Sequence, residues 1–465
     1  MGRGEVFVLG AGFSRAVSGH MPLTDELGAR LVHLDEQTFG SVRGSSFETW
    51  LSHRAEPQPY LTATENLGRQ AVFSRATSLI AGELDESIAR ALAEPMPTWL
   101  GELVSVWHLR RSHVVTFNYD TLVECVLPTM EFCDWRTGSQ FAWGSLLAFN
   151  PGGPAGSSYN EVQGSAAPVD TFRLWKLHGS TNWFWVPGDT SGASARRVML
   201  PGAFRSPRPV DAEEYHWMAP GRERLLVPPS ALKSPYYANP VTRETWSSGF
   251  RALRSADIVT LIGYSLPATD LTTAGMLGEA LHGGVVREVR IVDICPEAVV
   301  ERVRDLAPAN VDVHAVSAVD PVASYAAELL ADAARLLVAE LRATSDDDAS
   351  LLLVSWGDLA RQGRSAPIVH LEQSDEGRSV HLHAGEMTTL QGAVGAPQFS
   401  SEPISLSTLR AAITNAERLT VSVAASDGRS TLIAAQPHHA STGYGDGRWW
   451  VLVPAGAAPA PVEHA

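Results

Sequence analysis

Short runs of apolar, β-branched residues alternate with helical stretches along most of this 465-residue chain. Strands that are buried on both faces of a sheet read as such runs, and strands separated by helices pair in parallel. We therefore expect an α/β fold with a Rossmann-like parallel sheet. In such a sheet ligands bind beyond the carboxyl ends of the strands, so the polar residues after each run are the first candidates for chemistry. The runs assigned to the sheet are 5–9, 112–117, 172–177, 256–262, 288–292 and 311–316.

Two inserts interrupt this alternation. Residues 69–109 are helical in pattern, whereas residues 149–169 are rich in Pro, Gly and Ser and predict a loop. An amphipathic helix over 321–342 is expected to close this first domain, and the acidic run 344–348 predicts a linker. The first domain, with its helical insertions, is therefore expected to span residues 1–345.

The pattern changes from residue 351 to short strands with turn signals. Asp427-Gly428 between two β-branched runs predicts a hairpin. We expect a small, mostly-β C-terminal domain over 351–455, with a role in sensing or assembly, and a disordered tail over 456–465.

Charge and cysteine content exclude several classes of protein. The chain has 36 Lys and Arg against 51 Asp and Glu, a net charge of -15, so it lacks the positive field that attracts nucleic acids or anionic lipids. No apolar run is long enough for a transmembrane helix or a signal peptide. Cys125, Cys133 and Cys295 form neither a disulfide framework nor a paired zinc motif. We expect a cytoplasmic protein with no metal, no membrane contact and no direct nucleic-acid contact.

A glycine-rich motif, Gly10-Ala11-Gly12-Phe13-Ser14-Arg15, follows the first expected strand. Glycines let the backbone turn tightly, and the N–H groups at the start of the next helix can bind a diphosphate. The same motif is also compatible with a tight turn that binds nothing. Arg15 stands where a dehydrogenase fingerprint needs its third glycine, so hydride transfer is disfavoured.

Two polar residues at strand ends are candidates for catalysis. Asn118 ends the second apolar strand, where a buried amide needs hydrogen-bond partners that ribose hydroxyls would supply. His178 ends the third strand and is placed to act as a base near neutral pH. Both residues also have a structural interpretation, and Asp120 could either contact a ligand or cap the next helix.

The fourth and fifth strands end in further candidates. Gly263 permits close backbone approach, and Ser265 can donate to a phosphate. Asp293 could accept a hydrogen bond from a ribose hydroxyl. Each of these three residues could instead belong to an ordinary turn or cap.

The ordered series Gly-Ala-Gly-Phe-Ser, Phe-Asn-Tyr-Asp, Leu-His-Gly-Ser and Ile-Gly-Tyr-Ser-Leu-Pro resembles the sirtuin-like domain of bacterial anti-phage defence proteins over about residues 5–320. The resemblance implies a domain that binds NAD⁺ as its substrate and hydrolyses the bond to nicotinamide. It implies that Asn118 and His178 are catalytic. The residues it places on the dinucleotide are Gly10, Ala11, Gly12, Ser14, Arg15, Asp120, Gly263, Ser265 and Asp293.

One departure from the wider family bears on the reaction. Deacylating sirtuins carry a four-cysteine zinc module, and no cysteine lies between His178 and Gly263. We therefore expect an NAD glycohydrolase that depletes cellular NAD⁺ when infection is sensed. The alternatives are a nucleotide sensor without turnover, and an NAD-dependent protein deacylase or ADP-ribosyltransferase. The resemblance also implies self-association into a homo-oligomer, and a trigger or partner from the phage or a neighbouring gene.

Overall fold

The computed structural model describes residues 4–44, 46–130, 143–147, 171–208, 212–231, 233–316 and 318–329, together with eight strands beyond residue 350. The expected loop over 149–169, the linker over 344–348 and the tail lie outside the described residues. So does the part of the expected closing helix beyond residue 329; residues 321–329 are helical.

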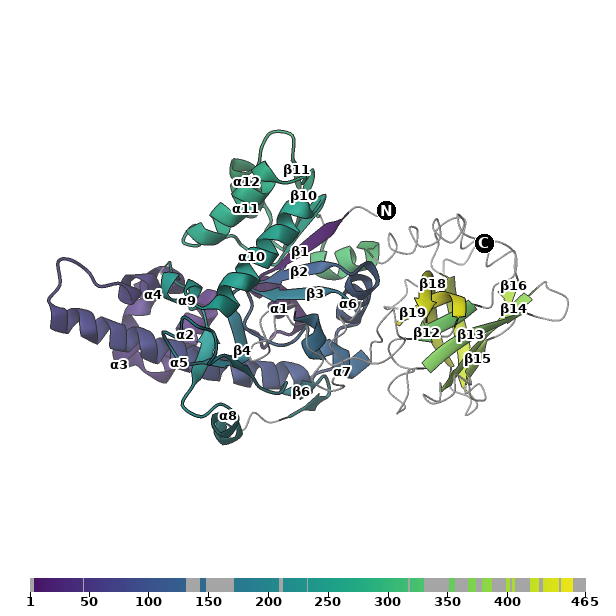
Figure 1. Cartoon of the computed structure of the whole chain (residues 1–465), viewed down its shortest axis with the longest axis horizontal. Helices are drawn as coiled ribbons and strands as arrows, with labels where there is room; N and C mark the ends of the chain where they lie inside the picture. The colour runs from purple at the N-terminus through teal and green to yellow at the C-terminus, as the bar shows by residue number, and fades with distance from the viewer. Residues whose placement is uncertain are drawn as a thin grey trace.

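A six-stranded parallel sheet forms the centre of the first domain (Figure 1). Its strands are β1 (Glu5–Leu9), β2 (His113–Thr116), β3 (Arg173–Lys176), β9 (Ile258–Ile262), β10 (Glu288–Val292) and β11 (Asp312–Ala315). They lie in the order β11-β10-β9-β1-β2-β3, and every neighbouring pair is parallel. This is the doubly wound order of a Rossmann-like sheet. The predicted fold class and all six predicted strands are confirmed.

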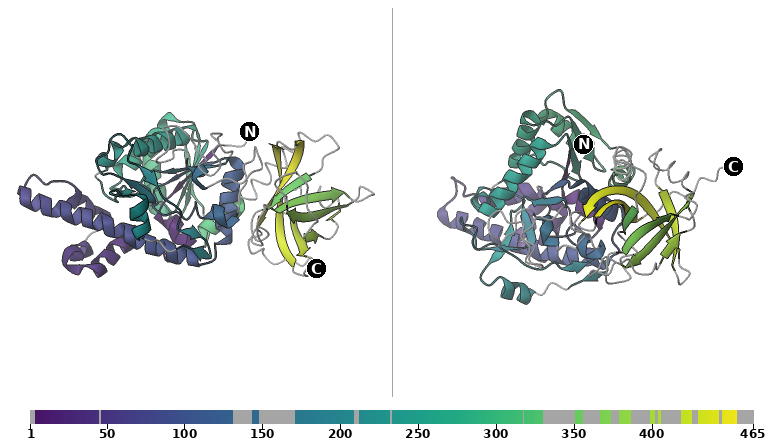
Figure 2. Two further views of the ribbon diagram at one scale, coloured as in Figure 1. Left: turned by 60° about the horizontal axis from the view of Figure 1, so that its bottom comes forward. Right: turned by 45° about the vertical axis from the view of Figure 1, so that its right-hand side comes forward.

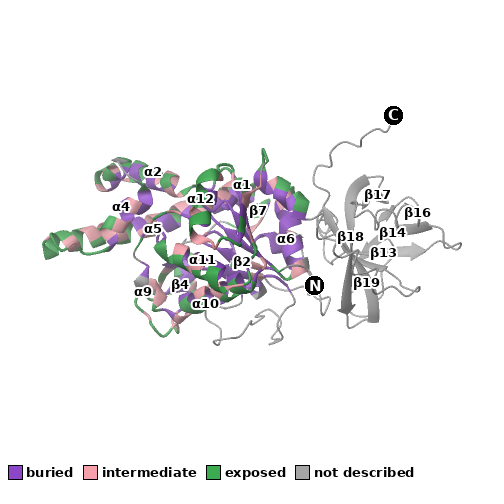
Figure 3. Ribbon diagram, turned by 90° about the horizontal axis from the view of Figure 1, so that it is seen from above, coloured by how far each residue is buried: buried purple, intermediate pink, exposed green. Residues whose placement is uncertain are grey.

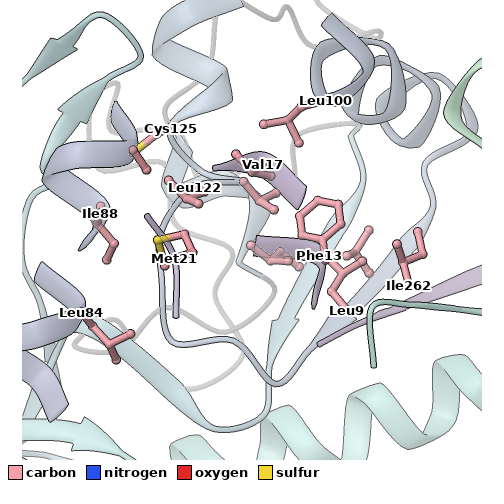
Figure 4. Close-up of a cluster of buried hydrophobic side chains, with 14 of the residues drawn as sticks. Leu9, Phe13, Val17, Met21, Leu84, Ile88, Leu100, Leu122, Cys125 and Ile262 are labelled. Carbon is pink, nitrogen blue, oxygen red and sulfur yellow. The ribbon is translucent and has the colours of Figure 1, made fainter. Parts of the chain in front are cut away.

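Side chains alternate between the two faces of this sheet and build a core on each. Figure 3 colours the chain by burial, and the sheet at its centre is largely buried. Phe7 and Leu9 of β1 point into one cluster with helices α1 (Ala11–Val17), α5 (Ala63–Ala93) and α6 (Thr98–Arg110). Figure 4 shows Leu9 among side chains of this cluster. Val6 and Val8 point into the other cluster, against α10 (Pro240–Ser255), α11 (Leu271–Gly283) and α12 (Glu297–Leu306).

The helical insert extends further toward the N-terminus than the pattern predicts. The Thr62 hydroxyl accepts from the backbone N–H of Glu65, and the Glu65 carboxylate accepts from the N–H of Thr62, a capping box that starts α5 at residue 63. Pro95 and Pro97 then separate α5 from α6, because proline cannot continue a helix. We call residues 24–93 the helical arm; its outer part extends away from the sheet (Figures 1 and 2). The arm contains α2 (Thr24–Leu34), α3 (Glu36–Phe39), the 3₁₀ turn η1 (Gly40–Gly44), α4 (Phe47–Ala55) and α5.

Shorter elements fill the remaining connections. Between β2 and β3 lie α7 (Val126–Met130) and η2 (Trp143–Leu146). Between β3 and β9 lie β4 (Gly179–Trp185), β5 (Arg196–Arg197), β6 (Gly202–Ala203), β7 (Ser206–Pro207), α8 (Ala212–Met218), β8 (Glu223–Leu226) and α9 (Ser234–Tyr237). None of the helices in the described ranges has the length and apolar character needed to cross a bilayer.

The C-terminal region forms an eight-stranded sheet of mostly antiparallel pairs, as the strand pattern predicts. The expected hairpin around Asp427-Gly428 is present as an antiparallel pairing of β17 (Leu419–Ala425) with β18 (Ser430–Thr442). The strands are β12 (Leu351–Ser355), β13 (Pro367–Gln373), β14 (Ser379–Glu386), β15 (Phe399–Ser401), β16 (Ile404–Ser405), β17 (Leu419–Ala425), β18 (Ser430–Thr442) and β19 (Gly445–Pro454).

Candidate active site

The strand order reverses between β1 and β9, and the backbone segments that follow these strands touch. The N–H of Gly12 donates to the carbonyl of Gly263 at 2.8 Å. A Cβ atom at Gly263, whose φ is +57°, would lie 2.1 Å from the nitrogen of Phe13, and one at Gly10 would lie 2.6 Å from the carbonyl oxygen of Gly263. Close backbone packing therefore requires these glycines, with or without a ligand. It also occupies the Gly12 N–H, one of the groups expected to be available to a diphosphate.

Asn118 is held in one orientation by a network that starts at this turn. Its Nδ2 donates to the carbonyl of Gly10 and to the hydroxyl of Ser14, both at 2.8 Å. Ser14 in turn donates to Asp120 Oδ2 at 2.6 Å, and Asp120 Oδ1 accepts from the N–H of Leu122 at 3.1 Å. Both amide protons of Asn118 are thus used. Its Oδ1 accepts nothing from the described residues and is available to a hydroxyl group of a ligand.

His178 lies on the neighbouring strand connection at the same edge of the sheet. Thr116 of β2 pairs with Lys176 of β3, so Asn118 and His178 each stand two residues beyond this pair. The ring of His178 is 5.0 Å from that of Phe117, in an edge-on contact, and 6.1 Å from that of Trp246. The sheet register therefore brings the two predicted catalytic residues to adjacent positions.

The imidazole of His178 is an uncharged base. Burial, and then the positive charge of Lys233, lower its pKa to about 3. The ring hydrogen-bonds to the backbone carbonyl of Phe117, whereas its Nε2 is buried and has no partner among the described residues. We assign the proton to Nδ1, as the donor to that carbonyl, which leaves the lone pair of Nε2 without a partner among the described residues. An imidazole in this form can accept a proton from a hydroxyl group or a water molecule.

Lys233 and Asp270, whose charges act on His178, and Glu48, whose carboxyl interacts with that pair, were not predicted as site residues. The Lys233 ammonium lies 2.6 Å from Asp270 Oδ1, and both side chains are almost fully buried. Burial is the largest influence on Asp270 and opposes its ionisation, but Lys233, His178 and the hydrogen bonds from Lys233 and Thr273 together hold the pKa of this carboxyl below its ordinary value. Glu48 of the helical arm contacts Thr269, and burial raises its pKa. The only sequence signal for any of them is the position of Asp270 before a helix, where it accepts from the N–H of Thr273 at 3.2 Å.

The other residues predicted to bind the dinucleotide lie at the same edge of the sheet. The structure does not test whether they contact a ligand. Ser265 is exposed in the turn after β9. Asp293 follows β10 and accepts from the N–H of Cys295 at 2.9 Å. Arg15, expected near the diphosphate, instead donates to both carboxylate oxygens of Glu26, at 3.0 and 2.9 Å. The roles of these residues, and of Ala11, stay predictions.

Comparisons with known proteins add little to this geometry. No protein-family model and no curated protein matches the sequence. One matching solved structure is described as "Structural Basis for the Mechanism and Regulation of Sir2 Enzymes"; the match covers 72% of this chain and 93% of the other, at 11% identity and a TM-score of 0.31. A likeness at that level carries no argument about activity. Within the described ranges, no group of three or more His, Cys, Asp or Glu side chains is arranged to hold a metal ion.

Proposed function

We propose that this chain is an NAD glycohydrolase, which cleaves NAD⁺ to nicotinamide and ADP-ribose. The observation that carries the proposal is the buried, uncharged His178, whose free Nε2 lies at the same sheet edge as the fixed amide of Asn118. The ordered motifs that supply these two residues support NAD⁺ as the substrate. The defence role, depletion of cellular NAD⁺ on infection, is proposed from the same motifs.

The chemistry suits one amide and one imidazole. Ordinary glycoside hydrolysis needs an acid to protonate the leaving oxygen, but the nicotinamide of NAD⁺ is a cationic pyridinium and leaves as a neutral molecule. The C–N bond breaks with its electron pair going to the pyridine nitrogen, and the oxygen of a water molecule bonds to the ribose C1′. Nε2 of His178 accepts the proton released from that water or from a ribose hydroxyl. Oδ1 of Asn118 accepts a hydrogen bond from a ribose hydroxyl and orients the sugar.

Product analysis of the purified full-length chain tests this proposal. The protein is incubated with NAD⁺, with and without an acetylated peptide, alone and with lysate of phage-infected cells as a source of trigger. We expect equal amounts of nicotinamide and ADP-ribose, independent of the peptide. Nicotinamide release that requires the peptide and yields deacetylated product would establish a deacylase instead. Tight NAD⁺ binding by calorimetry without any product in the triggered samples would establish a sensor.

A further inference from the structure

A buried ion pair joins two loops behind the aromatic rings of the candidate active site. Lys233 precedes α9, and Asp270 precedes α11. Their charged groups are 2.6 Å apart, with only 2% and 4% of the side chains exposed. An ion pair buried to this extent is costly to desolvate and is weak evidence for stability, so another role is worth seeking.

A chain of contacts connects this pair to the imidazole. The second carboxylate oxygen of Asp270 accepts from the hydroxyl of Tyr264 at 3.3 Å. The ring of Tyr264 stacks on that of Phe117, with centroids 4.6 Å apart and planes inclined by 18°. Phe117 in turn contacts His178 through its ring edge and through its backbone carbonyl. Asp270 is thus connected to His178 by contacts through two rings, while its charge acts on the imidazole directly.

Both residues of this ion pair act electrostatically on His178, with opposite effects. Lys233 disfavours a charged imidazole, and Asp270 favours one. Glu48 of α4 faces the same pair, and Asp25 of α2 faces Glu48. The hydroxyl of Tyr119 also belongs to this group, because Glu48 and Asp270 both act on it.

We propose that the Lys233–Asp270 ion pair is a positioning element of the active site, which fixes the Tyr264–Phe117 stack behind His178 and balances the charge that the imidazole experiences. Neither residue contacts the reacting atoms in this account. The inference rests on the proposed function. It concerns the protonation state of the His178 ring, which can be measured even in protein that does not hydrolyse NAD⁺.

Nitrogen NMR of the His178 ring, in full-length protein with labelled histidine, tests the proposal directly. The signals are assigned by their loss in His178→Gln. In wild type, and in the matched control Lys233→Arg, we expect an uncharged ring with its proton on Nδ1 from pH 8 down to pH 5. Lys233→Gln keeps a hydrogen-bond donor but leaves Asp270 unbalanced. It should therefore raise the proton affinity of His178 about ten-fold, which increases the charged fraction of the ring at pH 5 from about a hundredth to about a tenth.

A Lys233→Gln spectrum identical to wild type at pH 5, in folded protein, would overturn the proposal. The double variant Lys233→Gln with Asp270→Asn removes both charges and should restore the uncharged ring. If Lys233→Gln does not fold, Asp270→Asn carries the test: it retains the helix cap and leaves only Lys233 facing the ring, so any rise in the proton affinity of His178 would contradict the proposal. Absence of NAD⁺ hydrolysis would contradict the proposed function. The NMR outcomes would still decide whether the ion pair controls the charge of His178.

Discussion

Ser14 is the residue that joins the glycine-rich turn to the candidate catalytic amide. Its hydroxyl is buried, donates its proton to Asp120 and accepts from Asn118. We expect Ser14→Ala to cost about 1–3 kcal/mol in the free energy of unfolding, because Asp120 loses a buried partner. It should also lower NAD⁺ turnover about ten-fold, because the amide of Asn118 loses one of its two acceptors.

Ser18→Ala is the matched control for this prediction. Ser18 follows the same helix, is equally buried and donates to Glu94 at 2.7 Å, but it has no contact with Asn118. Urea denaturation and nicotinamide release are measured for both variants. A loss of turnover as large in Ser18→Ala as in Ser14→Ala would show that the effect on turnover arises from stability alone.

Among single residues, the sequence identifies polar site residues that directly follow a strand. It does not identify residues that reach the site only through tertiary packing. Asn118 and His178 were identifiable because each is a polar residue directly after an apolar run. Lys233 and Glu48 lie in segments with no such marker, and their proximity to Asp270 depends on how α4 and the loop before α9 fold back on the site. The ion pair of Arg15 with Glu26 was likewise invisible, because it depends on the course of the chain into α2.

The contact of the β1–α1 turn with the end of β9 is the element on which the site is built. Gly263→Ala places a Cβ atom 2.1 Å from the nitrogen of Phe13 at a positive φ. We expect a loss of about 3–5 kcal/mol in the free energy of unfolding, the sum of backbone strain and overpacking. Gly275→Ala on α11 is the control, since a Cβ there meets nothing within 4 Å. It should gain about 0.5–1 kcal/mol.

Urea denaturation of the two glycine variants decides this point. Equal stability of Gly263→Ala and wild type would mean that the two backbone segments are not packed as described. The sequence predicted that the glycines at this edge permit either the close approach of a ligand or an ordinary tight turn. The structure shows that at least part of the requirement comes from the protein backbone, which no strand pattern reveals.

Burial of His178 makes the free energy of unfolding of the whole molecule depend on pH. Its pKa is about 3 in the folded chain and about 6.5 when unfolded, so between these values the unfolded state binds more protons. Stability should therefore be full above pH 6.5 and fall as the pH decreases, by at most about 1.4 kcal/mol per pH unit for this group. His178→Gln removes this contribution. Denaturation at pH 7 and pH 5 should show a shallower pH dependence in the variant; parallel curves would show that His178 is not buried as an uncharged ring.

The architecture of the whole chain was predictable because both faces of the sheet are buried, which makes each strand a continuous apolar run and sets it apart from the amphipathic helices. The order of the strands was not predicted, because right-handed crossovers leave open where along the chain that order reverses. The helical arm was anticipated only as a helical insert. Its contribution of Glu48 to the site depends on packing across about 200 residues of sequence separation, from α4 to the turn before α11.

The most direct measurement of the central claim is nicotinamide release by Asn118→Ala, His178→Ala and the control His113→Ala. His113 is also a largely buried imidazole whose pKa is lowered by burial, but it lies at the opposite end of the sheet and accepts from Trp175 Nε1 at 3.1 Å. We predict that Asn118→Ala and His178→Ala each lose about 10²–10⁴-fold in kcat, whereas His113→Ala keeps the wild-type rate as long as it is folded. Wild-type turnover in folded Asn118→Ala and His178→Ala would contradict the assignment of this site.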